Sequence, residues 1–279
     1  MNPWIGGRLL WERACRDARW ATGTQPGRRI FGFGMGTSKT GSHSLAAMFA
    51  RSYRAVHEAE PSGVAMLMRA QAKRGLTEAG VHRRLRARVA RMNLELDVAP
   101  FHARFAEAYV ALFGAARFVH LHRDVHSWFD SNVNQVVGRY TPWTFREMRR
   151  ITYGTELASD PREGALIELG LRPLRSYLGA WAELNRGLLR SLPADRTLRV
   201  RTTELSGKVE ALADFFGVDV DTLDARRAHS FSAKVKAGVL DRIDSDYYNA
   251  VADEVCGEVM GELYPEVRDS RDVGFHAEQ

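Results

Sequence analysis

Gly32-Phe-Gly-Met-Gly-Thr-Ser-Lys-Thr-Gly-Ser-His-Ser44 is the stretch that decides the fold, because it joins a predicted buried strand to a predicted helix. The strand spans 29–34, and inward-facing apolar residues at helical spacing follow over 44–51. Glycines let backbone N–H groups approach an anion, and a helix N-terminus adds unpaired donors and its dipole. A cation and three hydroxyl groups lie within six residues here. We therefore predict an anion-binding loop at Lys39, Thr40, Gly41, Ser42, His43 and Ser44.

Outward from this loop, short apolar runs alternate with stretches of helical spacing. Further strands are predicted at 53–56, 94–98, 117–122 and 197–202. Helices are predicted at 62–92, with breaks near Gly75 and Gly80, and at 101–113, 125–136, 209–216 and 246–263. Such alternation is typical of βαβ units around a parallel sheet, and hence of an α/β fold. We expect one domain over 1–279, with a core at about 29–217, a mostly helical insertion at about 139–190 and a C-terminal closing segment at about 218–279.

A second polar pattern follows the strand predicted at 117–122. Arg123 lies at the carboxyl end of this strand, and Ser131 lies eight residues later, about two helical turns along. Ligands of doubly wound sheets bind beyond the carboxyl ends of the strands. Arg123 would offer a planar fork of donors to a phosphate, and Ser131 a hydroxyl group from the facing helix. The sequence therefore predicts two separated anion sites at one edge of the sheet.

The loop lacks the order of the Walker A motif, which ends in Gly-Lys-Ser/Thr. Ser38 precedes Lys39 here, and Gly41 follows the cation instead of preceding it. This order disfavours kinases and other NTPases. A P-loop nucleotide or small-molecule kinase is kept as the alternative function.

The order Lys-Thr-Gly-Ser-x-Ser-Leu at 39–45 resembles the 5′-phosphosulfate loop of sulfotransferases, and Arg123 with Ser131 resembles their 3′-phosphate signature. His43 and Val125 depart from the residues usual in that family. The resemblance implies a three-layer P-loop-like fold with a central parallel sheet of about five strands, a helical insertion and a C-terminal helix. It also implies the donor 3′-phosphoadenosine-5′-phosphosulfate (PAPS), which is released as adenosine 3′,5′-bisphosphate, and no metal.

The implied reaction is in-line transfer of a sulfuryl group to a hydroxyl of a small-molecule, lipid or carbohydrate acceptor. We expect Lys39 to stabilise charge on the leaving oxygen. A neutral hydroxyl also needs a general base. The candidates are His57, Glu58 and Glu60 after the second strand, and Asp97 in the third. Related sulfotransferases use a glutamate near the place of Glu58 or a histidine near that of Asp97, so we rank Glu58 first and Asp97 second.

Composition bounds the remaining possibilities. The 279 residues are 45% hydrophobic and 27% charged, which is typical of a globular protein. Residues 1–150 hold 24 Lys and Arg against 11 Asp and Glu, so the first half would attract an anionic ligand. No apolar run approaches about 18 residues, and none is long enough at the N-terminus for a secretory signal. We therefore expect a cytoplasmic protein without a transmembrane segment.

Neither a metal site nor a nucleic-acid site is expected. His120, His122 and His126 are close in sequence, but no carboxylate or cysteine completes a zinc spacing. The only cysteines, Cys15 and Cys256, have no paired spacing. Basic residues at helical spacing predict a solvated helix face; they are Arg83, Arg84, Arg86, Arg88 and Arg91.

The acceptor and the oligomeric state are not predicted by the sequence. An aromatic pocket would suit a lipid, polyketide or aryl acceptor, including a glycolipid, although aromatic residues at these spacings also suit a core. Its candidate residues are Trp128, Tyr140, Trp143, Phe145 and Tyr153.

Overall fold

A five-stranded parallel sheet forms the centre of the computed structural model, which describes residues 27–73, 75–137, 140–229 and 237–276. The strand order is β2-β3-β1-β4-β5, so β1 lies in the middle, with β2 and β3 on one side of it and β4 and β5 on the other. The strands are β1 (Gly32–Gly36), β2 (Ala55–His57), β3 (Leu96–Val98), β4 (Arg117–His122) and β5 (Thr197–Arg201). The predicted α/β fold with five parallel strands is confirmed.

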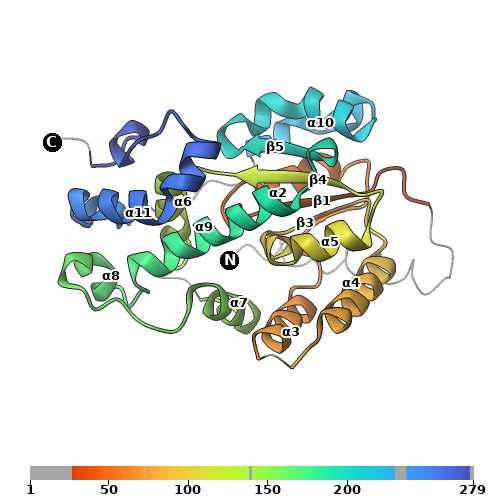
Figure 1. Ribbon diagram of the computed structural model, residues 1–279. Coiled ribbons are helices and arrows are strands. Elements are labelled where there is room, and N and C mark those ends of the chain that lie inside the picture. Colours follow the sequence, from red (N-terminus) through yellow and green to blue (C-terminus); the bar gives the residue numbers. More distant parts are fainter. Residues whose placement is uncertain (1–26, 74, 138–139, 230–236, 277–279) are drawn as a thin grey trace.

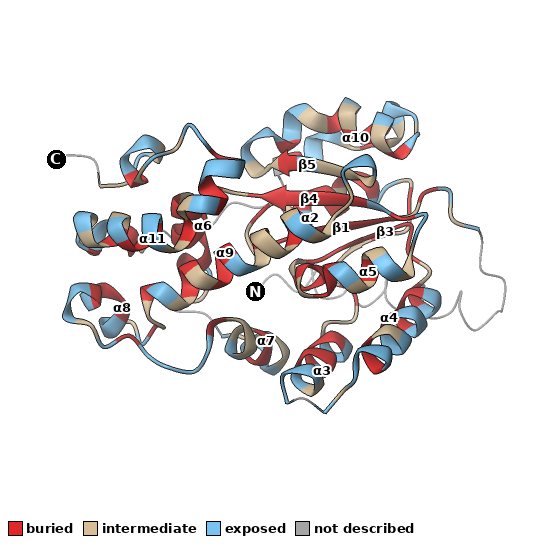
Figure 2. Cartoon of the chain, in the orientation of Figure 1, coloured by how far each residue is buried: buried red, intermediate tan, exposed pale blue. Residues whose placement is uncertain are grey.

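Helices cover both faces of this sheet (Figure 1). One apolar cluster joins the sheet to α2 (Ser42–Phe49) and α10 (Val209–Phe216). The cluster on the other face contains residues of α3 (Pro61–Ala72), α4 (Glu78–Met92), the 3₁₀ helix η1 (Pro100–Phe105), α5 (Ala106–Leu112), α7 (Trp143–Tyr153) and α9 (Leu174–Ser191). Three layers result, and Figure 2 shows β1, β3 and β4 between them as almost wholly buried, whereas the edge strand β5 is only partly buried.

A further apolar cluster lies beyond the end of the sheet. It joins α9 to α6 (Val125–Asn134), α8 (Gly164–Glu168) and α11 (Ser245–Leu263). The region predicted as a helical insertion thus contains α7, α8 and α9, and the predicted C-terminal helix is α11. Helix α6 reaches this cluster directly from β4, and its position decides the geometry of the site below.

The glycines of β1 explain how α2 approaches the sheet so closely. Phe33 and Met35 point to the face that α5 covers, and the alternate positions are glycine. A Cβ atom on Gly34 would lie 2.6 Å from Val98 Cγ1 and 3.0 Å from Leu45 Cδ2. The contact with Val98 is shorter than real Cβ contacts and that with Leu45 of α2 is tighter than most, so a side chain at Gly34 would displace both neighbours.

Two details of the sequence prediction are wrong. The first strand runs from Gly32 to Gly36, so it begins three residues later and ends two residues later than the predicted strand over 29–34. Gly80 does not break a helix; it lies in the first turn of α4, where its N–H donates to the side chain of the N-cap residue Thr77 at 3.2 Å. A threonine at the N-cap, whose hydroxyl accepts from the N–H three residues later, marks the start of a helix.

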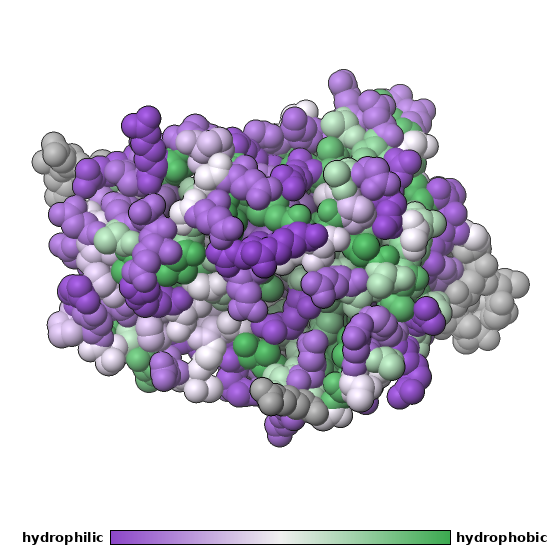
Figure 3. Space-filling model, viewed as in Figure 1, coloured by the Kyte–Doolittle hydropathy of each residue, from purple (hydrophilic) through white to green (hydrophobic). Residues whose placement is uncertain are grey.

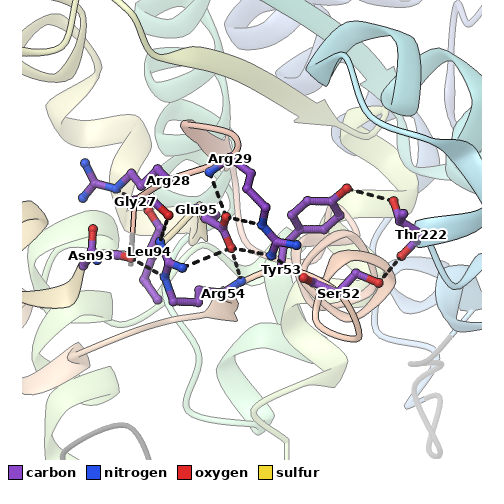
Figure 4. Close-up of polar contacts among 10 residues, drawn as sticks. All are labelled: Gly27, Arg28, Arg29, Ser52, Tyr53, Arg54, Asn93, Leu94, Glu95 and Thr222. Carbon is purple, nitrogen blue, oxygen red and sulfur yellow. Dashed lines mark hydrogen bonds and ion pairs between the residues drawn. The ribbon is translucent and has the colours of Figure 1, made fainter. Parts of the chain in front are cut away.

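A buried carboxylate ties the amino ends of the strands together (Figure 4). Glu95, just before β3, is fully buried. Its Oε1 accepts from the backbone N–H and the side chain of Arg29, each at 2.9 Å. Its Oε2 accepts from the backbone N–H of Arg54 at 2.8 Å. Burial alone would raise the pKa of Glu95, but these hydrogen bonds lower it to about 2.

A row of ion pairs joins α11 to its neighbours on the surface. Carboxylates one helical turn apart on α11 face arginines of α9 and β5; the pairs are Arg175–Glu254, Arg186–Glu258 and Arg199–Glu262. Figure 3 shows hydrophilic side chains gathered along this boundary. Among the described helices, none is long and apolar enough to cross a membrane.

Candidate functional site

The loop between β1 and α2 has the backbone of an anion-binding turn. Lys39 and Gly41 both have left-handed backbone conformations, with φ of 67° and 87°. Gly41 is the N-cap of α2, and no side chain caps the helix there. The first N–H groups of α2 therefore point from the helix end with the positive end of its dipole behind them. The loop can present N–H donors, the Lys39 side chain and serine hydroxyls to one anion.

Helix α6 holds this loop in place. Trp128 Nε1 donates to the carbonyl oxygen of Ser38 at 2.7 Å. One turn later, Asn132 Oδ1 accepts from Ser38 Oγ at 3.0 Å. Trp128 is fully buried, so it supports the loop and does not line the aromatic pocket that the sequence predicted for it. The spacing of Trp128, Ser131 and Asn132 on one helix face was the available signal for this support, and sequence reasoning missed it.

A cavity of about 710 Å³ lies against the loop. Residues of both predicted anion sites line it together; they are Lys39, Gly41, Ser42, His43, Ser44, Arg123 and Ser131. Thr40 is not among the lining residues, because its hydroxyl is buried and donates to the carbonyl oxygen of Thr37 at 2.7 Å. Two patterns about 80 residues apart in the sequence thus meet around one cavity.

Arg123 and Ser131 approach this cavity from the end of β4 and from α6. Trp181 Nε1 donates to the carbonyl oxygen of Arg123 at 3.2 Å, which fixes the backbone at the strand end. Within the described residues, the Arg123 guanidinium donates no hydrogen bond, and burial lowers its pKa. Thr202, just after β5, also lines the cavity, and its hydroxyl donates to the carbonyl oxygen of His122 at 3.0 Å. Both predicted anion-binding groups therefore line one cavity: the first comes from the loop between β1 and α2, and the second from the end of β4 and from α6.

A second cavity of about 390 Å³ adjoins the first. Tyr140, Phe145 and Tyr153 line it, as the sequence predicted, whereas Trp143 does not. The two cavities share five lining residues, which form their junction; they are Ser38, His57, Glu58, Pro100 and Gln135. A group that reacts with a ligand of the first cavity would reach it at this junction.

Glu58 is the carboxylate at the junction. It follows β2 directly and has a left-handed backbone, with φ of 52°. Its N–H donates to the carbonyl oxygen of Val98 at 2.9 Å, which anchors the turn to β3. Its side chain is 26% exposed, and burial raises its pKa to about 7. A carboxyl with a pKa near neutrality is well matched to general acid–base work.

The two neighbours of Glu58 are less suited to proton transfer at the junction. Burial and the nearby His43 lower the pKa of His57 to about 3, so its ring is neutral at pH 7 and weakly basic. His57 Nε2 lies 3.0 Å from Ser42 Oγ and thereby links β2 to α2. Glu60 lines neither cavity, and both its oxygens accept from Arg91 Nη2 at 2.6 Å.

Asp97 lies in a buried polar cluster beneath the Glu58 turn. Its carboxylate accepts from Arg88 Nη1 and lies 3.2 Å from His102 Nε2. Burial alone would raise the pKa of Asp97, but His102 and Arg88 hold it well below its usual value. Arg88 Nη2 also donates to the carbonyl oxygen of Ala59 at 2.7 Å. Asp97 lines neither cavity, and its partner Arg88 supports the turn that carries Glu58.

Arg88 corrects the prediction of a solvated arginine face on α4. Arg83, Arg84, Arg86 and Arg91 are exposed, but Arg88 is 4% exposed. The buried carboxylate of Asp97 explains the difference, because a buried guanidinium requires a partner of opposite charge.

The three histidines around β4 have structural partners. His120 Nε2 is 3.2 Å from Asn185 Oδ1, and His122 Nδ1 is 3.1 Å from Tyr264 Oη. His126 Nδ1 is 3.3 Å from Tyr248 Oη. In the part of the chain that the structure describes, no group of three potential ligands is arranged to hold a metal ion.

This α/β protein has two sets of hydrogen-bond donors for anions around one cavity and a carboxylate at the junction with a second cavity. Such an arrangement suits the transfer of a group between two bound molecules. A family model described as sulfotransferase domain matches residues 32–224, and the chain therefore belongs to this family. No curated protein matches the chain.

Three solved structures show what the chain is similar to. The sulfotransferase domain from the curacin biosynthetic pathway is 16% identical, with coverage of 89% of this chain and 96% of that one and a TM-score of 0.37. The sulfotransferase domain from the olefin synthase of Synechococcus PCC 7002 is 18% identical, with coverage of 82% and 88% and a TM-score of 0.39. Sulfotransferase STF9 from Mycobacterium avium is 11% identical, with coverage of 95% and 84% and a TM-score of 0.46.

Proposed function

We propose that this protein is a PAPS-dependent sulfotransferase that acts on a hydroxyl group of a small-molecule, lipid or carbohydrate acceptor. The observation that carries the proposal is the meeting of the Lys39 loop and the Arg123–Ser131 pair around one cavity of about 710 Å³. PAPS carries phosphate groups at both ends of its nucleotide, so two separated donor sets on one cavity fit it chemically.

One set of residues would bind the 5′ end of PAPS, and another set would bind its 3′-phosphate. Lys39, Ser42 and Ser44, with the N–H groups that begin α2, would hold the 5′-phosphosulfate. Arg123 and Ser131 would hold the 3′-phosphate by charge-assisted and neutral hydrogen bonds. Thr40 would contribute its backbone N–H, because its hydroxyl is already engaged within the loop.

PAPS would supply a sulfuryl group, which leaves the 5′-phosphate oxygen and forms a bond to the acceptor oxygen. Lys39 then faces the oxygen on which negative charge develops, where a fixed cation stabilises the transition state more than the ground state. Glu58 accepts the proton that the acceptor hydroxyl loses, because it is the carboxylate shared by both cavities.

We also propose that the chain forms the one domain predicted over 1–279, with a core at about 29–217 and a helical insertion at about 139–190 on the acceptor side; residues 1–26 of this range lie outside the described residues. The second cavity supports this proposal, because residues of α7 and α9 line it together with residues of the predicted core.

A thermal-shift comparison tests the function without an acceptor. Adenosine 3′,5′-bisphosphate should raise the Tm of the protein, and ATP with magnesium should raise it less, since ATP lacks the 3′-phosphate that Arg123 would bind. Stabilisation by ATP with magnesium alone would instead support a kinase and overturn the proposal.

A further inference from the structure

The second cavity combines apolar walls with two arginines. Aromatic and thioether side chains of α3, η1 and α7 form much of its lining; among them are Met68, Phe101, Phe145 and Met148. Arg104 comes from η1 and Arg149 from α7. Apolar walls favour a hydrophobic ligand, but guanidinium groups in such walls require a partner.

Arg149 has no such partner within the described residues. Its Nη2 atom is buried and makes no hydrogen bond. Its guanidinium carbon lies 5.1 Å from the centre of the Tyr153 ring, a cation–π contact that holds the side chain across the cavity wall. A buried donor without an acceptor is unfavourable, and the same guanidinium lines the cavity, so an anionic ligand there would compensate its charge.

The nearby carboxylates do not neutralise this charge. Glu147, two residues before Arg149, forms ion pairs with Arg150 at 2.8 Å and with Arg69 at 3.7 Å. Glu58 is the one carboxylate among the described lining residues, and it lies where this cavity meets the first, whereas Arg149 and Arg104 line this cavity alone of the two. The described part of the cavity thus has a carboxylate at the junction and positive charge elsewhere on its wall.

Building on the function proposed above, we infer that the acceptor is a hydroxy acid with an apolar body, whose carboxylate binds Arg149, while Arg104 adds a second positive charge to the lining of the same cavity. The planar guanidinium of Arg149 matches a carboxylate, and a singly charged group loses less solvation in apolar walls than a doubly charged phosphate. Repulsion by ionised Glu58 and attraction by Arg149 orient the molecule, so its hydroxyl faces the junction and its acid group faces α7. Arg149 is therefore a specificity-determining residue.

Calorimetric titrations with matched probes test this inference. The probes are 4-hydroxyphenylalkanoic acids and ω-hydroxyalkanoic acids, each paired with its neutral primary amide, added at pH 8 with and without saturating adenosine 3′,5′-bisphosphate. We expect at least one acid to bind about 10-fold or more tightly than its amide, as one charge-assisted pair allows. In Arg149→Met this preference should disappear. The matched control is Arg146→Met, which removes an exposed charge from the same helix but outside the cavity.

Several outcomes would overturn the inference. They are equal binding of acids and amides by the wild-type protein, a preference that survives in Arg149→Met, an equal loss in Arg146→Met, and no binding by any acid in a protein that binds the nucleotide. If Arg149→Met does not fold, the wild-type comparison of acid with amide still decides. Failure of the nucleotide itself to bind is a separate result, and it counts against the proposed sulfotransferase function.

Discussion

At the scale of single residues, Glu58 and Asp97 show how environment separates two strand-end carboxylates. Asp97 is buried and paired with Arg88, so its pKa falls and its negative charge compensates the buried guanidinium. Among the described residues no cation lowers the pKa of Glu58, and burial raises this pKa to about 7. The same residue chemistry thus yields a structural ion in one place and a candidate base in the other.

Glu58→Gln should keep the fold and donor binding but reduce turnover by roughly 10²–10⁴-fold, the usual contribution of a general base. The pKa of about 7 places the acid limb of the wild-type rate profile near neutrality, because the ionised carboxylate is the active form. Steady-state rates across pH measure both effects. Asp97→Asn is the matched control, and full activity of Glu58→Gln beside a folded but inactive Asp97→Asn would transfer the role to Asp97.

Glu58→Gln should also raise the Tm above pH 7. A carboxyl whose folded-state pKa is raised favours folding while protonated, and that stability is lost as the pH rises through about 7. The neutral amide avoids this loss. Calorimetry at pH 6 and pH 8 should show a larger gain at pH 8, and a gain that is larger at pH 6 would contradict the assigned pKa direction.

Lys39→Ala should lower turnover more than donor affinity, because charge builds on the leaving oxygen only as the reaction proceeds. Rates at saturating donor, together with calorimetric affinities for adenosine 3′,5′-bisphosphate, separate the two effects. Unchanged turnover at saturating donor would restrict Lys39 to a structural role in its loop.

At the scale of elements, the site depends on how β1, β3 and α6 are fixed relative to one another. Glu95 fixes the amino ends of the strands, and the Trp128 and Asn132 side chains of α6 fix the loop at the carboxyl end of β1. Arg88 of α4 supports the turn after β2 through Ala59. Each contact joins elements that are distant in sequence, so the site exists only in the assembled sheet.

Glu95→Gln should lower the free energy of unfolding by about 1.5–3 kcal/mol at pH 7, the usual contribution of hydrogen bonds to a charged group, since the Arg29 side chain is 58% exposed and stays solvated without its partner. The pKa of Glu95 is lowered to about 2, so its contribution is present above the ordinary value of 4.5 and is lost as the pH falls towards 2. Urea denaturation at pH 7 and pH 3 should show a smaller difference from wild type at pH 3. Glu254→Gln, at an exposed pair, is the control and should cost less at pH 7.

At the scale of the whole molecule, much of the fold and half of the site could be predicted from the sequence. Alternating apolar runs located every strand, and the polar residues at strand ends located the first cavity, because parallel strands bring those ends to one edge. The second cavity could not be predicted in full. Arg104 and Arg149 reach it from η1 and α7, and no local spacing specifies how those elements pack. The ion pair of Arg88 with Asp97 could not be predicted for the same reason.

The central claim is that one cavity binds a nucleotide with phosphates at both ends, and calorimetric titration of two nucleotides tests it most directly. Wild-type protein should bind adenosine 3′,5′-bisphosphate at least about 10-fold more tightly than adenosine 5′-phosphate, since one charge-assisted bond contributes about 1.5–3 kcal/mol. Arg123→Ala should lose most of this preference while its affinity for adenosine 5′-phosphate changes little. A folded Arg123→Ala protein that keeps the wild-type preference for the bisphosphate would contradict the account.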